Sequence, residues 1–285
     1  MPLGDFERAV LRELAANRNP DSFIGGATVL HQTADSPRQS EDVDVFHDLP
    51  EALLSAYEAD SAALRAAGFA VEPVGRVRPE FRRVVVRRQD LQTKIEWVQD
   101  SAFRFFPVEP DLELGWRMNF WDAATNKVLA MAGRQKLRDF LDCLHLHTRH
   151  LHLGALAWAA SGKDPGLTPE FILDWALRGN RFFPEDLAEV RLGKPIDLVV
   201  TKQAWFAAVQ EARELVARLP AGELGCLYLG PRGDPVCPDP AQASLRQRQR
   251  RVAEHRGRLM PEARIRRFAP RNIGRVVRFL GGDGP

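Results

Sequence analysis

The stretch Phe23–Phe46 reads FIGGATVLHQTADSPRQSEDVDVF, and it decides the fold. Its short apolar start is stopped by Gly25-Gly26, after which the spacing of apolar residues is helical over 27–34. Residues 40–46 then alternate with period two, which predicts a strand. A glycine pair between a strand and a helix start lets backbone amides approach an anion. The stretch therefore indicates an α/β unit with a phosphate-binding turn.

Three carboxylates accompany this turn. Asp42 and Asp44 are two residues apart on the predicted strand, so both lie on one face, a few ångströms apart. Glu96, next to Lys94-Ile95, lies on a later predicted strand where polar and apolar residues alternate. Like charges at this spacing repel unless a cation lies between them, and Mg²⁺ prefers carboxylate oxygens. A phosphate-binding turn beside three metal-binding carboxylates is what nucleotidyl transfer needs.

Outward from this stretch, strands dominate to about residue 108 and helices follow. The pattern predicts strands at 69–74, 81–88 and 92–98 and helices at 5–17, 49–67, 171–177, 185–189 and 202–219. Between 122 and about 153 it is helical almost without interruption. We expect an α/β (α+β) fold, with a short mixed sheet followed by a mostly helical C-terminal half. The expected division is 1–120, 121–221, a Gly/Pro-rich linker at 222–240 and a basic segment at 241–285.

A helical stripe of charge is predicted within this second part. Lys127, Arg134, Arg138 and Asp142 are spaced 7, 4 and 4 residues apart, which places them along one face of a single helix. Three cations facing an acidic metal site would grip a triphosphate. Asp139 lies one position off the stripe, where it could orient Arg138 or Arg134. Read alone, such charges are typical of an exposed face with ion pairs along the helix.

The overall net charge of +2 conceals a strong asymmetry. Residues 241–285 carry 12 arginines against three acidic residues, whereas the other 240 residues carry 28 basic and 35 acidic residues. The arginines of 246–278 favour contact with nucleic-acid phosphates, with few aromatic residues for base stacking. Docking on an acidic partner, including the body of the protein itself, is the alternative.

Four motifs in fixed order carry a resemblance to a known family. They are Phe23-Ile24-Gly25-Gly26-Ala27-Thr28, Arg38-Gln39-Ser40-Glu41-Asp42-Val43-Asp44, Lys94-Ile95-Glu96, and Lys127-Val128-Leu129-Ala130 through Arg134 to Arg138-Asp139 and Asp142. Over about residues 20–145 the chain resembles the nucleotidyltransferase superfamily, and more narrowly the AbiEii/AbiGii type of nucleotidyltransferase toxin. Two positions depart from that pattern. Ala27 stands where the family usually has Thr, and Glu96 stands where Asp is commoner.

The resemblance implies a minimal nucleotidyltransferase core and an enzyme that moves an NMP from an NTP to a hydroxyl. Asp42, Asp44 and Glu96 would be catalytic and would hold Mg²⁺, with Mn²⁺ as a substitute. The implied nucleotide-binding residues are Gly25, Gly26, Arg38, Ser40, Lys94, Lys127, Arg134, Arg138, Asp139 and Asp142. The implied biology is that of a bacterial toxin with a cognate antitoxin, and the basic tail favours tRNA or another RNA as acceptor.

Composition narrows the remaining classes of protein. With 45% hydrophobic and 27% charged residues the chain is globular, and no apolar run is long enough to span a membrane. The acidic N-terminus is unlike a secretory signal, and three scattered cysteines are unlike a disulfide framework, so we expect a cytoplasmic protein. Alternatives are a catalytically weak nucleotide- or RNA-binding relative, a protein that binds RNA through its tail alone, and a kinase-like phosphoryl transferase.

Overall fold

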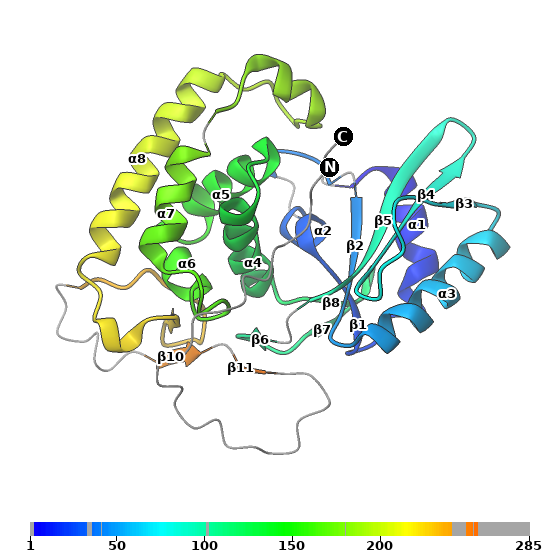
Figure 1. Ribbon diagram of the computed structural model, residues 1–285, viewed down its shortest axis with the longest axis horizontal. Coiled ribbons are helices and arrows are strands. Elements are labelled where there is room, and N and C mark those ends of the chain that lie inside the picture. The colour runs from blue at the N-terminus through cyan, green and yellow to red at the C-terminus, as the bar shows by residue number, and fades with distance from the viewer. Residues whose placement is uncertain are drawn as a thin grey trace.

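A seven-stranded mixed sheet organises the N-terminal part of the chain, with the strand order β3-β4-β5-β2-β1-β8-β7 (Figure 1). The computed structural model describes residues 3–32, 36–40, 42–100, 103–179, 181–240, 249–252 and 254–255. The strands of the sheet are β1 (Ser22–Gly25), β2 (Asp42–His47), β3 (Ala70–Pro73), β4 (Phe81–Arg88), β5 (Leu91–Gln99), β7 (Glu109–Asp111) and β8 (Gly115–Arg117). Strand β2 is parallel to β5 and antiparallel to β1. The short mixed sheet expected from the sequence is confirmed.

One face of this sheet is closed by two helices, α1 (Asp5–Ala15) and α3 (Pro50–Ala66). Trp97 of β5 is fully buried on that face, and its indole nitrogen donates a hydrogen bond of 2.7 Å to Asp60 of α3. Val84 and Ile95, paired across β4 and β5, are fully buried beside it. Because side chains alternate along a strand, the residues between them point to the other face. That other face carries the carboxylates.

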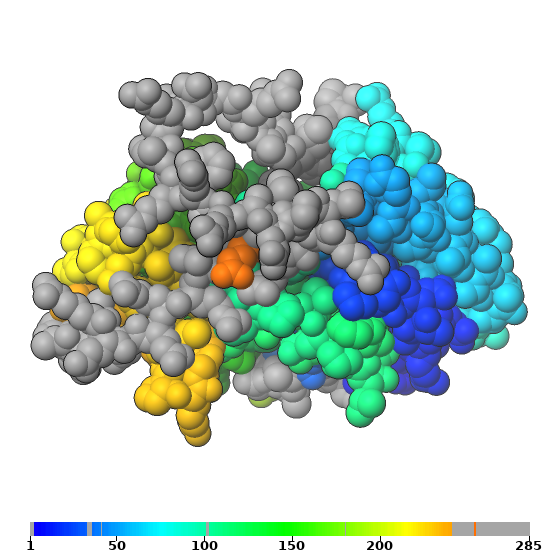
Figure 2. Space-filling model, turned by 90° about the horizontal axis from the view of Figure 1, so that it is seen from below, coloured from blue at the N-terminus to red at the C-terminus, as the bar shows by residue number. Residues whose placement is uncertain are grey.

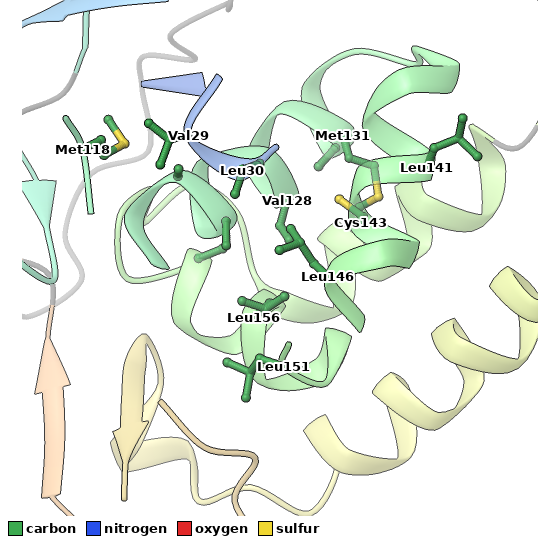
Figure 3. Packing of buried hydrophobic residues seen from close by; sticks show 14 of the residues in the cluster. Val29, Leu30, Met118, Val128, Met131, Leu141, Cys143, Leu146, Leu151 and Leu156 are labelled. Carbon is green, nitrogen blue, oxygen red and sulfur yellow. The ribbon is translucent and has the colours of Figure 1, made fainter. Parts of the chain in front are cut away.

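Helices form the second part of the chain and also flank the carboxylate face. They are α2 (Gly26–Leu30), α4 (Phe120–Gly133), α5 (Leu137–Arg149), α6 (Leu153–Ala160), α7 (Pro169–Arg178) and α8 (Leu198–Val216), with 3₁₀ turns η1 (Pro184–Glu189) and η2 (Ala221–Glu223). Figure 3 shows Val29 and Leu30 of α2 in one apolar cluster with Val128 of α4 and Leu146 of α5. Among the described residues, no helix has the length and apolar character to cross a membrane.

The continuous helix expected between 122 and 153 is wrong. Helix α4 ends at Gly133, Arg134 is extended, and α5 begins at Leu137. Glycine ends a helix readily because it has the lowest propensity of any residue except proline. In one straight helix, residues 12 apart would be separated by about 18 Å. The break lets α5 fold back against α4, which brings Asp139 within 2.8 Å of Lys127.

The segment 222–240 contains ordered structure that its glycine and proline content did not predict. Strand β9 (Cys226–Leu229) contacts α6, and Leu227 and Tyr228 are buried. Gly225, with φ +80°, lies against Gly162, where a side chain would collide with backbone. The apolar run of β9 is too short to stand out in the sequence among the glycine and proline residues around it. The division of the chain into separate units stays a prediction.

Two further short pairings involve the start of the basic segment. Strand β10 (Gln249–Val252) pairs with β9, and β11 (Glu254–His255) pairs with β6 (Phe103–Arg104). The rest of 241–285, including most of the arginine-rich segment, lies outside the described residues.

From below, the blue and cyan N-terminal residues lie on one side and the yellow α8 on the other, with green residues between them (Figure 2).

Lowering the pH from 7 to 5 is expected to reduce the free energy of unfolding, with His47 contributing about 2 kcal/mol. His47 is fully buried on β2, and burial, together with Arg18, lowers its pKa to about 3 from an ordinary 6.5. Between pH 7 and pH 5, His47 therefore becomes protonated in the unfolded chain but stays neutral in the folded chain. The contribution of neutral His47 to the free energy of unfolding is present above pH 6.5 and is lost as the pH falls.

Urea titrations at several pH values test this origin of acid sensitivity. The difference in unfolding free energy between the wild type and His47→Gln, measured at pH 8 as a baseline, should shift in favour of the variant as the pH approaches 5. A difference that stays constant with pH would assign the acid sensitivity to other groups.

Candidate active site

The glycine pair forms the turn from β1 into α2 and lies against the carboxylates. Gly26 has φ +62°, and a Cβ there would lie 2.1 Å from Oδ2 of Asp44. A Cβ on Gly25 would lie 2.5 Å from the ring of Phe46. Both positions therefore require glycine, for close approach and, at Gly26, for conformation as well. The turn predicted from the sequence lies beside Asp44, where its backbone can reach a ligand held by the carboxylates.

The register between two parallel strands brings the three carboxylates together. Asp44 of β2 pairs with Glu96 of β5, and Asp42 pairs with Lys94. Since neighbouring strands are about 4.8 Å apart, Asp44 has a carboxylate neighbour along its own strand and another across the sheet. Burial, followed by the charges of Glu96 and Asp42, raises the pKa of Asp44 to about 7. A cation at this position would relieve that repulsion.

Two arginines hold the outer carboxylates. Nη1 of Arg138, on α5, lies 3.0 Å from Oδ2 of Asp42, and Nη2 of Arg83, on β4, lies 2.7 Å from Oε1 of Glu96. In the described part of the chain, no group of three His, Cys, Asp or Glu side chains converges closely enough to hold a metal ion. The donor set of hard oxygens and the raised pKa of Asp44 fit Mg²⁺. For all three carboxylates to coordinate one metal ion, Asp42 must give up its contact with Arg138 and Glu96 its contact with Arg83.

A buried charge network supports the site from the helical side. Nζ of Lys127, on α4, lies 2.8 Å from Oδ1 of Asp139 and 3.1 Å from Oδ2 of Asp142, both on α5. Nε of Arg134, between these helices, lies 2.8 Å from Oδ2 of Asp139. Of the two arginines that Asp139 was expected to orient, it pairs with Arg134, whereas Arg138 pairs with Asp42. The single charged stripe was wrong because the helix is broken. The charges come together from two helices and a turn.

Asp142 is the centre of this network. It accepts two hydrogen bonds from Arg38, from Nε at 2.7 Å and Nη2 at 2.6 Å, and its Oδ1 lies 2.9 Å from Nε2 of His31. Burial alone would raise the pKa of Asp142, but His31, Lys127 and Arg38 outweigh burial and hold it well below its ordinary value. The carboxylate stays ionised and fixes three cationic or polar groups behind the glycine turn.

Ser40 and Lys94, which were both expected to bind the nucleotide, have different surroundings. Ser40 is buried, and its hydroxyl donates a hydrogen bond of 2.9 Å to the carbonyl oxygen of Asp42, which fixes the start of β2. Lys94 is exposed on β5 beside Asp42. Ser40 therefore supports the strand that carries the carboxylates, whereas Lys94 is open to a ligand.

Comparison with known proteins identifies the family. Over 77% of this chain and 84% of the other, the fold is similar to that of MenT4, a nucleotidyltransferase toxin from Mycobacterium tuberculosis, with 18% sequence identity and a TM-score of 0.56. A candidate nucleotidyltransferase from H. pylori covers 75% of this chain and 94% of its own, with 17% identity and a TM-score of 0.48. A search of curated proteins gave no match. The model of the nucleotidyl transferase AbiEii toxin family, Type IV TA system, matches residues 9–184. The chain belongs to the AbiEii family.

The match to the AbiEii family confirms the family resemblance and covers every candidate site residue named from the sequence. It ends before α8 and β9, so the family model describes the sheet and the helices next to it. As a member of this family the protein is a nucleotidyltransferase.

Sequence reasoning missed two polar residues of this AbiEii site. Arg83 was missed because its contact with Glu96 depends on the β4–β5 register. A two-residue turn at Gln89-Asp90 fixes that register, since Arg88 pairs with Leu91, and counting back from it pairs Arg83 with Glu96. His31 followed the glycine motif in the sequence, but only the tertiary structure brings it to Asp142, 111 residues away.

Substituting Gly26 by Ala is expected to lower transfer activity of this AbiEii protein by about 100-fold or more, because misplacing reacting groups by about 1 Å has that effect. The new methyl group would displace the carboxylate of Asp44 and strain a backbone with positive φ. Steady-state transfer rates measure the loss. Gly222→Ala is the matched control, since a Cβ there meets nothing within 4 Å. Equal activity in both variants would contradict the close approach.

Proposed function

We propose that this AbiEii-family nucleotidyltransferase moves an NMP from an NTP to a hydroxyl of RNA, with Mg²⁺ as cofactor. The observation that carries the proposal is the juxtaposition of Asp42, Asp44 and Glu96 on one sheet face, against a turn that only glycine can form. Three negative charges beside a backbone turn suit a metal-bound triphosphate.

Each residue has a definite task in this proposal. Asp42, Asp44 and Glu96 would hold Mg²⁺, which would neutralise the triphosphate and the charge that develops on the leaving pyrophosphate. The backbone of Gly25 and Gly26 contacts phosphate oxygens. Glu96 takes the proton of the acceptor hydroxyl, whose oxygen forms a bond to the α-phosphorus. The bond from the α-phosphorus to the bridging oxygen breaks, and pyrophosphate leaves.

The cations of the helical side complete the nucleotide site in this proposal. Arg138 has a side chain 38% exposed, and when Asp42 binds metal its guanidinium is free to contact a phosphate. Lys127 and Arg134 lower the pKa of Asp44 through their charge, so they stabilise its ionised form. Arg38, Ser40, Asp139 and Asp142 act by fixing these groups, and Lys94 contacts the nucleotide directly.

The biological setting is proposed from the family. AbiEii proteins are toxins of a Type IV toxin–antitoxin system, so we propose a cognate antitoxin and action on RNA in the cytoplasm, where NTP and RNA are present. The arginines of 246–278 supply phosphate contacts that do not depend on sequence. Binding through this segment should weaken steeply as salt is added.

Labelled nucleotides distinguish this function from its alternatives. The purified full chain is incubated with Mg²⁺, total tRNA and each NTP in turn, labelled with ³²P on either the α- or the γ-phosphate. Label on RNA from the α-position alone, with pyrophosphate released, is the expected result. Transfer from the γ-position would establish a kinase-like reaction. Binding of NTP with no transfer to any acceptor would favour the catalytically weak relative.

A further inference from the structure

The face of the sheet that carries the carboxylates continues outward onto β4. Arg83 pairs with Glu96, Val85 with Lys94, and Arg87 with Gln92, so these side chains share the face of Asp42 and Asp44. The intervening Val84 and Val86 are fully buried on the opposite face of the sheet, the face that α1 and α3 cover at the neighbouring strand β5. Side chains of Arg83 and Arg87 are 36% and 48% exposed, and Lys94 is exposed as well. A cationic strip therefore borders the catalytic carboxylates.

The position of this strip relative to the proposed nucleotide site indicates which substrate it could bind. The glycine turn lies between β1 and α2, and α4, which carries Lys127, packs on α2, so these groups lie on the β1 and helical side of the carboxylates (Figure 1). Strand β4 lies on the other side, beyond β5 and Glu96. In phosphoryl transfer, the attacking and the leaving oxygens are roughly in line on opposite sides of the phosphorus. A triphosphate held by the helical side therefore leaves the β4 side for the attacking hydroxyl.

We propose that Arg83 and Arg87 form the acceptor-binding strip, which binds backbone phosphates of the RNA next to the attacking hydroxyl. This inference rests on the proposed function, and it places the second substrate, the RNA acceptor, on the β4 side of the carboxylates. Arg83 and Arg87 are about 13 Å apart along an extended strand, so they reach different phosphates of one RNA strand. Arginine suits this task because its planar fork matches two phosphate oxygens.

Neighbouring groups agree with a strip that engages RNA. Phe81 lies on the same face of β4, and the guanidinium of Arg83 lies 5.2 Å from the centre of its ring. Aromatic rings with an adjacent arginine are typical stacking surfaces for bases of single-stranded RNA. The facing acidic groups are Glu96, which the proposal gives to metal, and Glu72 of β3. Glu72 lies 3.4 Å from Arg87 in an exposed pair, which a phosphate can readily replace.

Two adjacent arginines of β4 provide a matched test. Arg87 lies on the carboxylate face, whereas Arg88 points to the other face, where Nη2 donates to the carbonyl oxygen of Ala67 and the guanidinium lies over the ring of Phe69. In the full chain, Arg87→Gln and Arg88→Gln remove the same charge one residue apart. Both are compared for binding of total tRNA at a series of salt concentrations, and for steady-state transfer.

The expected result separates the two faces. Arg87→Gln raises the KM for tRNA by about fivefold to tenfold and leaves the KM for NTP unchanged, while Arg88→Gln changes neither. The slope of log Kd against log salt falls by about 0.7 to 0.9 for Arg87→Gln alone, as for one lost phosphate contact. A merely structural role of Arg87 would leave this slope unchanged.

Other results overturn the inference in recognisable ways. If the wild type labels tRNA but the two variants behave alike, the acceptor-binding strip is wrong and the proposed function stands. If label enters a protein hydroxyl and not tRNA, both the strip and the RNA acceptor are wrong, although nucleotidyl transfer stands. If tRNA binds with unchanged slope in both variants and no label is transferred anywhere, both proposals fail.

Discussion

Asp44→Asn is expected to reduce nucleotidyl transfer by about 1,000-fold or more, since loss of a metal ligand removes several kcal/mol of transition-state stabilisation. Asp44 lies between Asp42 and Glu96 and beside Gly26, so no neighbouring carboxylate can take its place. Single-turnover transfer of α-labelled NMP to tRNA measures the effect. Asp90→Asn, in the exposed β4–β5 turn, is the control for loss of one negative charge and should keep full activity.

The same substitution is expected to leave the fold intact, which separates catalysis from stability. The pKa of Asp44 is raised to about 7, above its unfolded value of 3.8, so ionisation of this group opposes folding at higher pH. An amide carries no charge and has nearly the same shape. Urea unfolding at pH 8 without metal should therefore show Asp44→Asn at least as stable as the wild type. Loss of activity together with loss of stability would contradict an assignment to metal binding.

Local patterns were sufficient to predict the four strands at 40–46, 69–74, 81–88 and 92–98, among them the two that carry the three carboxylates, but not β7 and β8. The alternation over 40–46, with buried Val43 and Val45 between Asp42 and Asp44, is a property of neighbouring residues. The β-branched run in β4 and the turn at Gln89-Asp90 are equally local. Parallel pairing of β2 with β5 then aligned Glu96 with Asp44, as the motif order implied.

The surroundings of the carboxylates depend on contacts that no local pattern contains. The break after Gly133 turned an expected stripe of cations into a buried network, because α5 folds back on α4 and pairs Lys127 with Asp139. The contact of His31 with Asp142 joins residues 111 positions apart. In 222–240, burial of Tyr228 overrides a composition typical of a loop. Each difference is a case in which tertiary packing outweighs local propensity.

Asp142→Ala is expected to reduce the free energy of unfolding by about 3–5 kcal/mol, the usual effect of removing one partner from a buried ion pair. The side chain of Asp142 is 1% exposed and contacts His31, Arg38 and Lys127. Without it, the cations Arg38 and Lys127 lose a carboxylate partner in an interior that disfavours their charge. Urea unfolding at pH 7 measures the loss. Asp174→Ala, which removes an exposed pair with Arg213, should change stability by less than about 1 kcal/mol.

The pH dependence of this loss identifies the charge as its cause. The folded pKa of Asp142 lies well below the ordinary 3.8, so its contribution is complete above pH 4 and is lost as the pH falls towards the folded pKa. The stability gap between the wild type and Asp142→Asn, which retains the shape of the side chain, should therefore narrow as the pH falls below 4. A gap of constant size would mean that the stabilisation by Asp142 does not depend on its ionisation. Lys127 and Arg38 would then need no ionised partner to hold them behind the glycine turn.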